Sequence, residues 1–135
     1  MMAPPARGLL DTSVFIALET ARPLNAEALP EESVVCPITI AELQAGVLAA
    51  TNLETRARRL ATIEALADVE VLPIDADVAA AWAHLRVHLH EQRRRVNVND
   101  LWVAATAVAN ALPVVTQDDD FDSLEGVLGL AVIRV

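Results

Sequence analysis

The chain has 135 residues and a formal net charge of −9, from 19 acidic and 10 basic residues, and every basic residue is an arginine. Its length fits one domain, and a hydrophobic content of 54 % can bury a core, which excludes a disordered chain. The absence of lysine excludes enzymes that need a Schiff-base or phosphate-loop lysine. The acidity argues at first against nucleic-acid binding, which usually requires a basic surface.

Short apolar runs alternate with helical patterns along the chain. We predict, in chain order, a strand at 8–10, a helix at 12–19, a helical turn at 25–29, a strand at 33–36, a helix at 40–50 opened by Thr39, a helix at 53–63, a strand at 69–72, a helix at 78–89, a helix at 100–110 capped by Asn99, and strands at 114–116 and 130–135. This alternation predicts an α/β domain in which a parallel β-sheet is sandwiched by α-helices.

Acidic residues stand where these predicted elements meet. Asp11 ends the first strand, Glu42 lies in the first turn of the helix after the second strand, and Asp118–Asp120 follow the strand at 114–116. Because the carboxyl ends of parallel strands meet at one edge of a sheet, we expect these acids to converge there. No clear strand precedes Asp100, so it joins them only if its helix begins at the same edge.

Converged carboxylates repel one another and stay ionised together only when a cation neutralises them. An all-oxygen set of three or four carboxylates suits Mg²⁺ or Mn²⁺ better than Zn²⁺. Such an ion can activate water and stabilise charge on a phosphoryl oxygen. The pattern therefore indicates metal-assisted phosphate-ester chemistry, without identifying the ester.

Each acid also has a purely structural interpretation. Glu42 could close a capping box with Thr39, Asp100 could favour the dipole of its helix, and Asp118–Asp120 could form a solvated turn. Asp11 directly follows a buried strand and is harder to explain by solvent. Four independent structural coincidences are less credible than any one of them.

Four sequence blocks resemble the PIN domains of VapC-type toxin ribonucleases. They occur in the order and with the separations typical of that family, and they span nearly the whole chain. The blocks are LLDTSVFI at 9–16, TIAELQAG at 39–46, NDLWVAATA at 99–107 and VTQDDDF at 115–121.

The resemblance implies a single PIN domain over residues 1–135 and assigns roles to individual residues. The implied catalytic and metal-binding acids, which would hold Mg²⁺ (or Mn²⁺), are Asp11, Glu42, Asp100 and Asp118. Secondary candidates near the metal are Ser13, Thr116 and Asp120. Within the acidic run, which also contains Asp119, the resemblance assigns the fourth metal-site position to Asp118.

The resemblance also implies the activity and the partners. It implies the toxin of a type II toxin–antitoxin system, an endoribonuclease that hydrolyses RNA phosphodiester bonds by metal-activated water and leaves a 3′-hydroxyl and a 5′-phosphate. It further implies a homodimer neutralised by a VapB-type antitoxin, and the acidity of the site predicts a basic antitoxin segment there. The single cysteine, Cys36, and the lack of a membrane-spanning stretch favour a cytoplasmic protein.

Two alternatives stay open at this point. A different metal-dependent phosphohydrolase, such as an aspartyl-phosphate phosphatase or a receiver domain, would use a lysine near the phosphoryl group, and this chain has none. A catalytically silent PIN-like interaction module would have lost site acids, yet the acids are all present.

Two further features have two interpretations each. Arg93–Arg95 could contact RNA phosphates, since guanidinium forks match them, or could be a solvated helix end. Trp82 and Trp102 lie in apolar helices, which favours core packing over base stacking. With two Trp, two Phe and no Tyr, an aromatic stacking surface is improbable.

Overall fold

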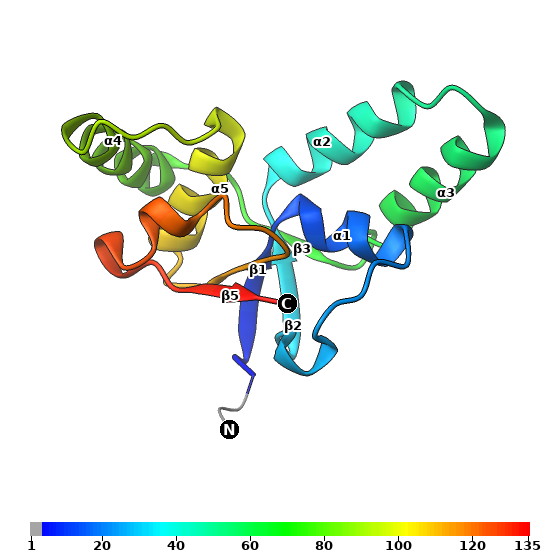
Figure 1. Ribbon diagram of the computed structural model, residues 1–135, viewed down its shortest axis with the longest axis horizontal. Helices are drawn as coiled ribbons and strands as arrows, with labels where there is room; N and C mark the ends of the chain where they lie inside the picture. The colour runs from blue at the N-terminus through cyan, green and yellow to red at the C-terminus, as the bar shows by residue number, and fades with distance from the viewer. Residues whose placement is uncertain (1–3) are drawn as a thin grey trace.

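A computed structural model describes residues 4–135, so the first three residues of the expected 1–135 domain lie outside it. Its centre is a five-stranded sheet in which every neighbouring pair is parallel, in the order β3-β2-β1-β4-β5 (Figure 1). The strands are β1 (Arg7–Leu10), β2 (Glu32–Val35), β3 (Glu70–Val71), β4 (Val114–Thr116) and β5 (Val132–Arg134).

Helices connect these strands and cover the sheet. They are α1 (Thr12–Glu19), α2 (Pro37–Leu48), α3 (Leu53–Glu64), α4 (Ala76–Glu91) and α5 (Val98–Ala109), with 3₁₀ turns at Ala26–Ala28, Asp122–Leu124 and Val127–Gly129. α2 and α3 form a hairpin that projects to one side, whereas α4 and α5 lie together on the other (Figure 1). No helix within residues 4–135 is long and apolar enough to cross a bilayer.

Both faces of the sheet are buried, because successive strand residues point to opposite sides. On one face, Leu9, Val34 and Val114 pack with side chains of α4 and α5. On the other face, the next residue of each strand packs among side chains of α1, α2 and the segment after α3; these residues are Leu10, Val35 and Val115. The predicted α/β fold, a parallel sheet between helices, is therefore confirmed.

The strand order has its turning point between β1 and β4. From β1 the chain builds outward through β2 and β3, and it then returns to add β4 and β5 on the other side. Parallel sheets place ligand sites at the carboxyl ends of the strands next to such a point. A helix that leads into a parallel strand runs back across the sheet, so α5 begins at this same edge. Asp100, in the first turn of α5, therefore lies at the same edge of the sheet as the other acids, which the sequence alone left open.

Several predicted boundaries were wrong. α2 begins at Pro37, with Cys36 as its N-cap, so Thr39 lies inside the helix instead of opening it. Proline is favoured in the first helical turn because its missing N–H has no partner there. α5 is capped by Asn97, whose Oδ1 accepts the N–H of Asn99 at 2.8 Å, so Asn99 is not the cap. The strands β3 and β5 are shorter than predicted.

At Gly8 the backbone of β1 lies so close to Val115 and Pro30 that a side chain would not fit. A Cβ added there would lie 2.8 Å from Cγ2 of Val115 and 3.1 Å from Cγ of Pro30. Overpacking of this kind typically costs about 1–3 kcal/mol. We therefore expect Gly8→Ala to lower the free energy of unfolding by that amount in urea denaturation, and an unchanged midpoint would contradict the packing described here.

Candidate active site

Asp11 lies at the centre of the carboxyl edge of the sheet. It directly follows β1, its N–H donates to the carbonyl of Val115 at 2.9 Å, and its side chain is only 4 % exposed. Ser13 Oγ donates to Asp11 Oδ2 at 2.7 Å, and Thr116 Oγ1 lies 3.1 Å from the same oxygen. Ser13 Oγ in turn accepts the N–H of Gln117 at 3.0 Å. This carboxylate is thus fixed by the first turn of α1 and by the end of β4.

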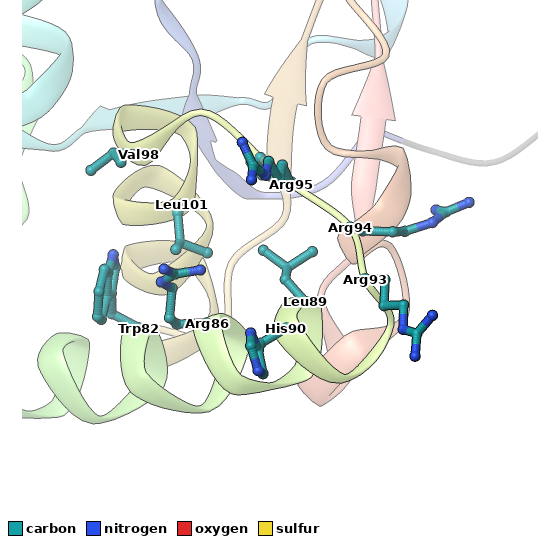
Figure 2. Close-up of a pocket in the computed structure, with 10 residues that line it drawn as sticks. Trp82, Arg86, Leu89, His90, Arg93, Arg94, Arg95, Val98 and Leu101 are labelled. Carbon is teal, nitrogen blue, oxygen red and sulfur yellow. The ribbon is translucent and has the colours of Figure 1, made fainter.

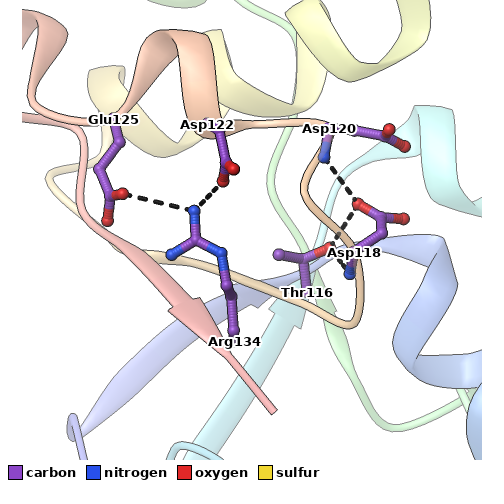
Figure 3. Close-up of polar contacts among 6 residues, drawn as sticks. All are labelled: Thr116, Asp118, Asp120, Asp122, Glu125 and Arg134. Atoms are coloured by element: carbon purple, nitrogen blue, oxygen red, sulfur yellow. Dashed lines mark hydrogen bonds and ion pairs between the residues drawn. The ribbon is translucent and has the colours of Figure 1, made fainter.

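Asp118 is joined to Asp11 through a shared hydroxyl. Thr116 Oγ1 lies 3.1 Å from Asp118 Oδ1, the same distance as from Asp11 Oδ2, and its single proton can serve only one of them at a time. Asp118 Oδ1 also accepts the N–H of Asp120 at 3.2 Å (Figure 3). The acidic run is therefore an ordered loop that presents Asp118 toward Asp11, while Asp119 and Asp120 are exposed.

Glu42 is held by two residues that the sequence did not mark as part of the site. Thr12 Oγ1 donates to Glu42 Oε1 at 2.7 Å, and Asn99 Nδ2 donates to Oε2 at 3.5 Å. The capping-box interpretation of Glu42 is wrong, because Thr39 lies within α2 and its hydroxyl has no hydrogen-bond partner. Thr12 and Asn99 each adjoin a candidate acid in sequence, and this was the only available signal.

Asp100 lies in the first turn of α5, where a helix N-terminus favours an anion. Its surroundings nevertheless disfavour the charged form. Desolvation raises the pKa of Asp100 to about 7, helped by the negative charges of Asp11, Asp120, Asp118 and Glu42. Burial also raises the pKa of Asp11, and the charge of Asp118 adds to it. These five carboxyl groups are close enough to act on one another.

No basic side chain neutralises this cluster. Among residues 4–135, the ion pairs do not include Asp11, Glu42, Asp100 or Asp118. At the end of β5, Arg134 pairs instead with Asp122 and, at 3.3 Å, with Glu125 (Figure 3). Within the part of the chain that the structure describes, no direct ion pair therefore offsets the negative charge of these four acids.

The carboxylates gather without yet forming a coordination shell. Within residues 4–135, no three His, Cys, Asp or Glu side chains are already arranged to hold one metal ion. The donor set itself, all carboxylate oxygen, is the chemistry that Mg²⁺ and Mn²⁺ prefer.

The raised pKa of Asp100 predicts how stability depends on pH. Between the ordinary carboxyl pKa of 3.8 and about 7, the folded chain binds a proton at Asp100 that the unfolded chain releases. In chelator, this stabilising contribution is fully present below about pH 4 and is lost as the pH rises through about 7. We expect Asp100→Asn to remove this part of the pH dependence, which thermal unfolding of both proteins from pH 4 to 8 would measure. Parallel curves would contradict it.

The comparisons with known proteins agree with this geometry. A family model for the PIN domain matches residues 8–127, which is most of the chain. The chain belongs to the PIN domain family. The match includes both strands that carry the site and every candidate acid, so the resemblance seen in the four sequence blocks is confirmed.

Named relatives of this PIN domain are ribonucleases of the VapC type. The chain is 53 % identical to Ribonuclease VapC5 of Mycobacterium tuberculosis over 135 residues, the full length of both. It is 42 % identical to Ribonuclease VapC4 of the same organism over 121 residues, covering 90 % of this chain and 93 % of the relative.

Solved structures resemble it as well. The toxin–antitoxin pair VapBC-5 of Mycobacterium tuberculosis matches with a TM-score of 0.91 and 53 % identity, covering 97 % of this chain and 100 % of the other. FitAcB of Neisseria gonorrhoeae matches with a TM-score of 0.71 and 30 % identity, covering 93 % of this chain and 96 % of the other.

Proposed function

We propose that this PIN domain is the toxin of a type II toxin–antitoxin system and acts as a metal-dependent endoribonuclease. The observation that carries the proposal is the meeting of Asp11, Glu42, Asp100 and Asp118 at the turning point of the sheet, where none of the four forms an ion pair within residues 4–135. The names of the VapC relatives, ribonucleases, support the choice of RNA as the substrate.

The residues present fit a divalent cation. Four carboxylates, each anchored in a different element, offer oxygen ligands, and the raised pKa values of Asp11 and Asp100 reflect their burial and the negative charges around them. PIN-domain ribonucleases are in general dependent on divalent metal, and Mg²⁺ or Mn²⁺ suits this donor set. When bound, such an ion supplies the positive charge that activates water and stabilises the phosphate under attack.

Other side chains of the chain orient the carboxylates that would bind the cation. Ser13 and Thr116 fix Asp11, and Thr116 also orients Asp118. Thr12 and Asn99 aim the carboxylate of Glu42 from α1 and α5. Hydrogen bonds that orient metal ligands typically contribute 10- to 100-fold to metal affinity. In this proposal Asp120 adds negative charge at the edge without being a ligand.

The partner follows from the same electrostatics. We propose an antitoxin that covers the sheet edge with a segment bearing arginine or lysine, because a basic side chain there would take the place of the cation. The VapBC-5 structure, from a family of toxin–antitoxin systems, supports a partner of this kind. A homodimer and a cytoplasmic location complete the proposal.

RNA cleavage by the partner-free chain tests the proposed function. The chain is incubated with transfer RNA, ribosomal RNA and a DNA of matched length, with Mn²⁺ or with chelator. We expect cleavage of RNA only, in metal only, leaving 5′-phosphate ends. Cleavage of DNA alone would favour another phosphohydrolase, and absence of cleavage in every arm would favour a silent interaction module.

The shared hydroxyl of Thr116 gives a finer prediction. Thr116→Val keeps the shape but removes the group that contacts both Asp11 and Asp118. We expect the Mn²⁺ concentration for half-maximal cleavage to rise about 10- to 100-fold, with the maximal rate largely retained. Thr106→Val is the matched control, since it removes an equally buried hydroxyl that donates to the Trp102 carbonyl. Equal metal dependence in both variants would contradict this role.

A further inference from the structure

Four of the ten arginines lie within ten residues at the end of α4. Arg86, Arg93, Arg94 and Arg95 are all exposed, and among residues 4–135 none of their guanidinium groups forms an ion pair or a hydrogen bond. Other arginines, such as Arg7, are paired with acids. In a chain of net charge −9, this is a concentrated positive surface without an internal partner.

These arginines border a cavity of about 560 Å³ between the second half of α4 and the start of α5. Figure 2 shows Arg86 on α4 and Arg95 on the segment after it on opposite sides of Leu101, whereas Arg94 extends away from the cavity. Arg93 points away from it. We call this cavity the arginine groove; its size is that of a typical ligand pocket.

The walls of the arginine groove are preformed. Trp82, on one wall, stacks on Trp102 with ring centroids 5.0 Å apart and planes inclined by 21°, so its indole is fixed by the core. At the other end Arg93 adopts φ 53°, which terminates α4, and the N–H of Arg94 returns to the carbonyl of Leu89 at 2.9 Å. This turn fixes the direction in which the arginine segment leaves the helix.

The arginine groove adjoins a cavity that reaches the acidic site. A second cavity of about 590 Å³ shares Arg94, Arg95 and Val96 with it and extends to Asp100. Its other wall comprises Asp119, Asp120 and Asp122. The segment from Arg94 to Val96 therefore lies between the arginine groove and a cavity bordered by the candidate catalytic Asp100.

We propose that the arginine groove binds the RNA backbone beside the cleaved bond, with Arg86 and Arg95 contacting phosphates one or a few nucleotides away. Guanidinium forks match phosphate oxygens, and this contact is independent of sequence. RNA is favoured over an acidic protein because the groove ends at the site where a phosphate must lie. The inference rests on the proposed function.

The arginine groove also explains how a negatively charged RNA could approach an acidic site. The acidic edge repels a polyanion, and at physiological salt charges act over only about 8 Å. The distant arginines of the chain therefore cannot offset this repulsion, whereas a local row of guanidinium groups can hold the strand as it enters the site. Arg93, which points away, takes no part in this proposal.

Binding of RNA in chelator tests the proposal without cleavage. A fluorescein-labelled, mixed-sequence single-stranded RNA of about 20 nucleotides is titrated with wild type, the double variant Arg86→Gln/Arg95→Gln, and the control Arg22→Gln, an exposed arginine elsewhere. We expect the double variant to raise Kd about tenfold or more and to reduce the slope of log affinity against log salt by about 2, or one per phosphate contact. We expect the control to match wild type, and all three to melt alike.

Unchanged Kd and salt slope for RNA in the double variant would overturn the groove proposal. The proposal would also be overturned if the double variant bound the antitoxin more weakly but bound RNA as wild type does. A cleavage assay separates this failure from that of the proposed function. In the RNA that wild type cleaves, the double variant should raise KM with kcat within about twofold. If wild type binds RNA through these arginines but cleaves none, the groove stands and the ribonuclease assignment falls.

Discussion

Replacing Asp100 by Asn is expected to lower metal-dependent RNA cleavage by about 100-fold or more while the chain stays folded. The negative charges of four other carboxylates, those of Asp11, Asp120, Asp118 and Glu42, all raise the pKa of Asp100. Asp100 therefore lies where the negative charge that would hold a cation is concentrated. A bound cation contributes several kcal/mol to the transition state, and about 1.4 kcal/mol corresponds to tenfold in rate. The measurement is the initial rate of cleavage at saturating Mn²⁺.

Thermal unfolding in chelator separates loss of chemistry from loss of fold. Asn removes a repelled charge, so at pH 8 the variant should be at least as stable as wild type. Asp68→Asn is a suitable control, since Asp68 is an exposed acid outside the site, and it should leave the rate unchanged. Full activity in Asp100→Asn would contradict the proposed role.

Mn²⁺ is expected to stabilise the fold strongly. An ion that binds only the folded chain stabilises it by about 2.7 kcal/mol at 100 times its Kd, which for a domain of this size raises Tm by several degrees. The effect should grow as the pH rises past about 7, because Asp100 must lose its proton before it can bind metal. Differential scanning calorimetry with and without Mn²⁺ at pH 6 and 8 measures both trends.

A variant of the site serves as the control for this calorimetric experiment. Asp11→Asn should abolish most of the Mn²⁺-dependent rise in Tm, because Asp11 is the buried centre of the cluster. An equal rise in wild type and Asp11→Asn would place the ion elsewhere on this acidic chain.

Much of the fold could be predicted because local signals were strong. The run before Asp11 and the strand at 114–116 are short and apolar, and α1 matched its predicted limits at Thr12–Glu19. Trp82 and Trp102 stack on each other, with Trp102 partly buried, as core packing predicts. Boundaries were harder, because a cap is decided by backbone geometry: Asn97 and Asn99 are equally plausible as sequence, and only Asn97 caps α5.

The candidate acids could be named from the sequence, but the residues that hydrogen-bond and orient them could not. Asp100 reaches the site because α5 runs back across the sheet, a consequence of strand order that no local pattern contains. Thr12 meets Glu42 across 30 positions, and Thr116 meets Asp11 across 105. The arginine groove likewise depends on how α4 packs on α5, so Arg93–Arg95 alone could not distinguish an RNA contact from a solvated end.

Chelation followed by rescue tests the central claim most directly: that RNA cleavage depends on a cation held by the carboxylates at the sheet edge. The partner-free chain and Asp11→Asn are treated with chelator, dialysed, and assayed on one RNA as Mn²⁺ is returned. We predict that cleavage by wild type is abolished and then restored with a saturable dependence on Mn²⁺, and that Asp11→Asn is not restored at the same concentrations. Cleavage that persists in chelator, or equal rescue of both proteins, would contradict the account.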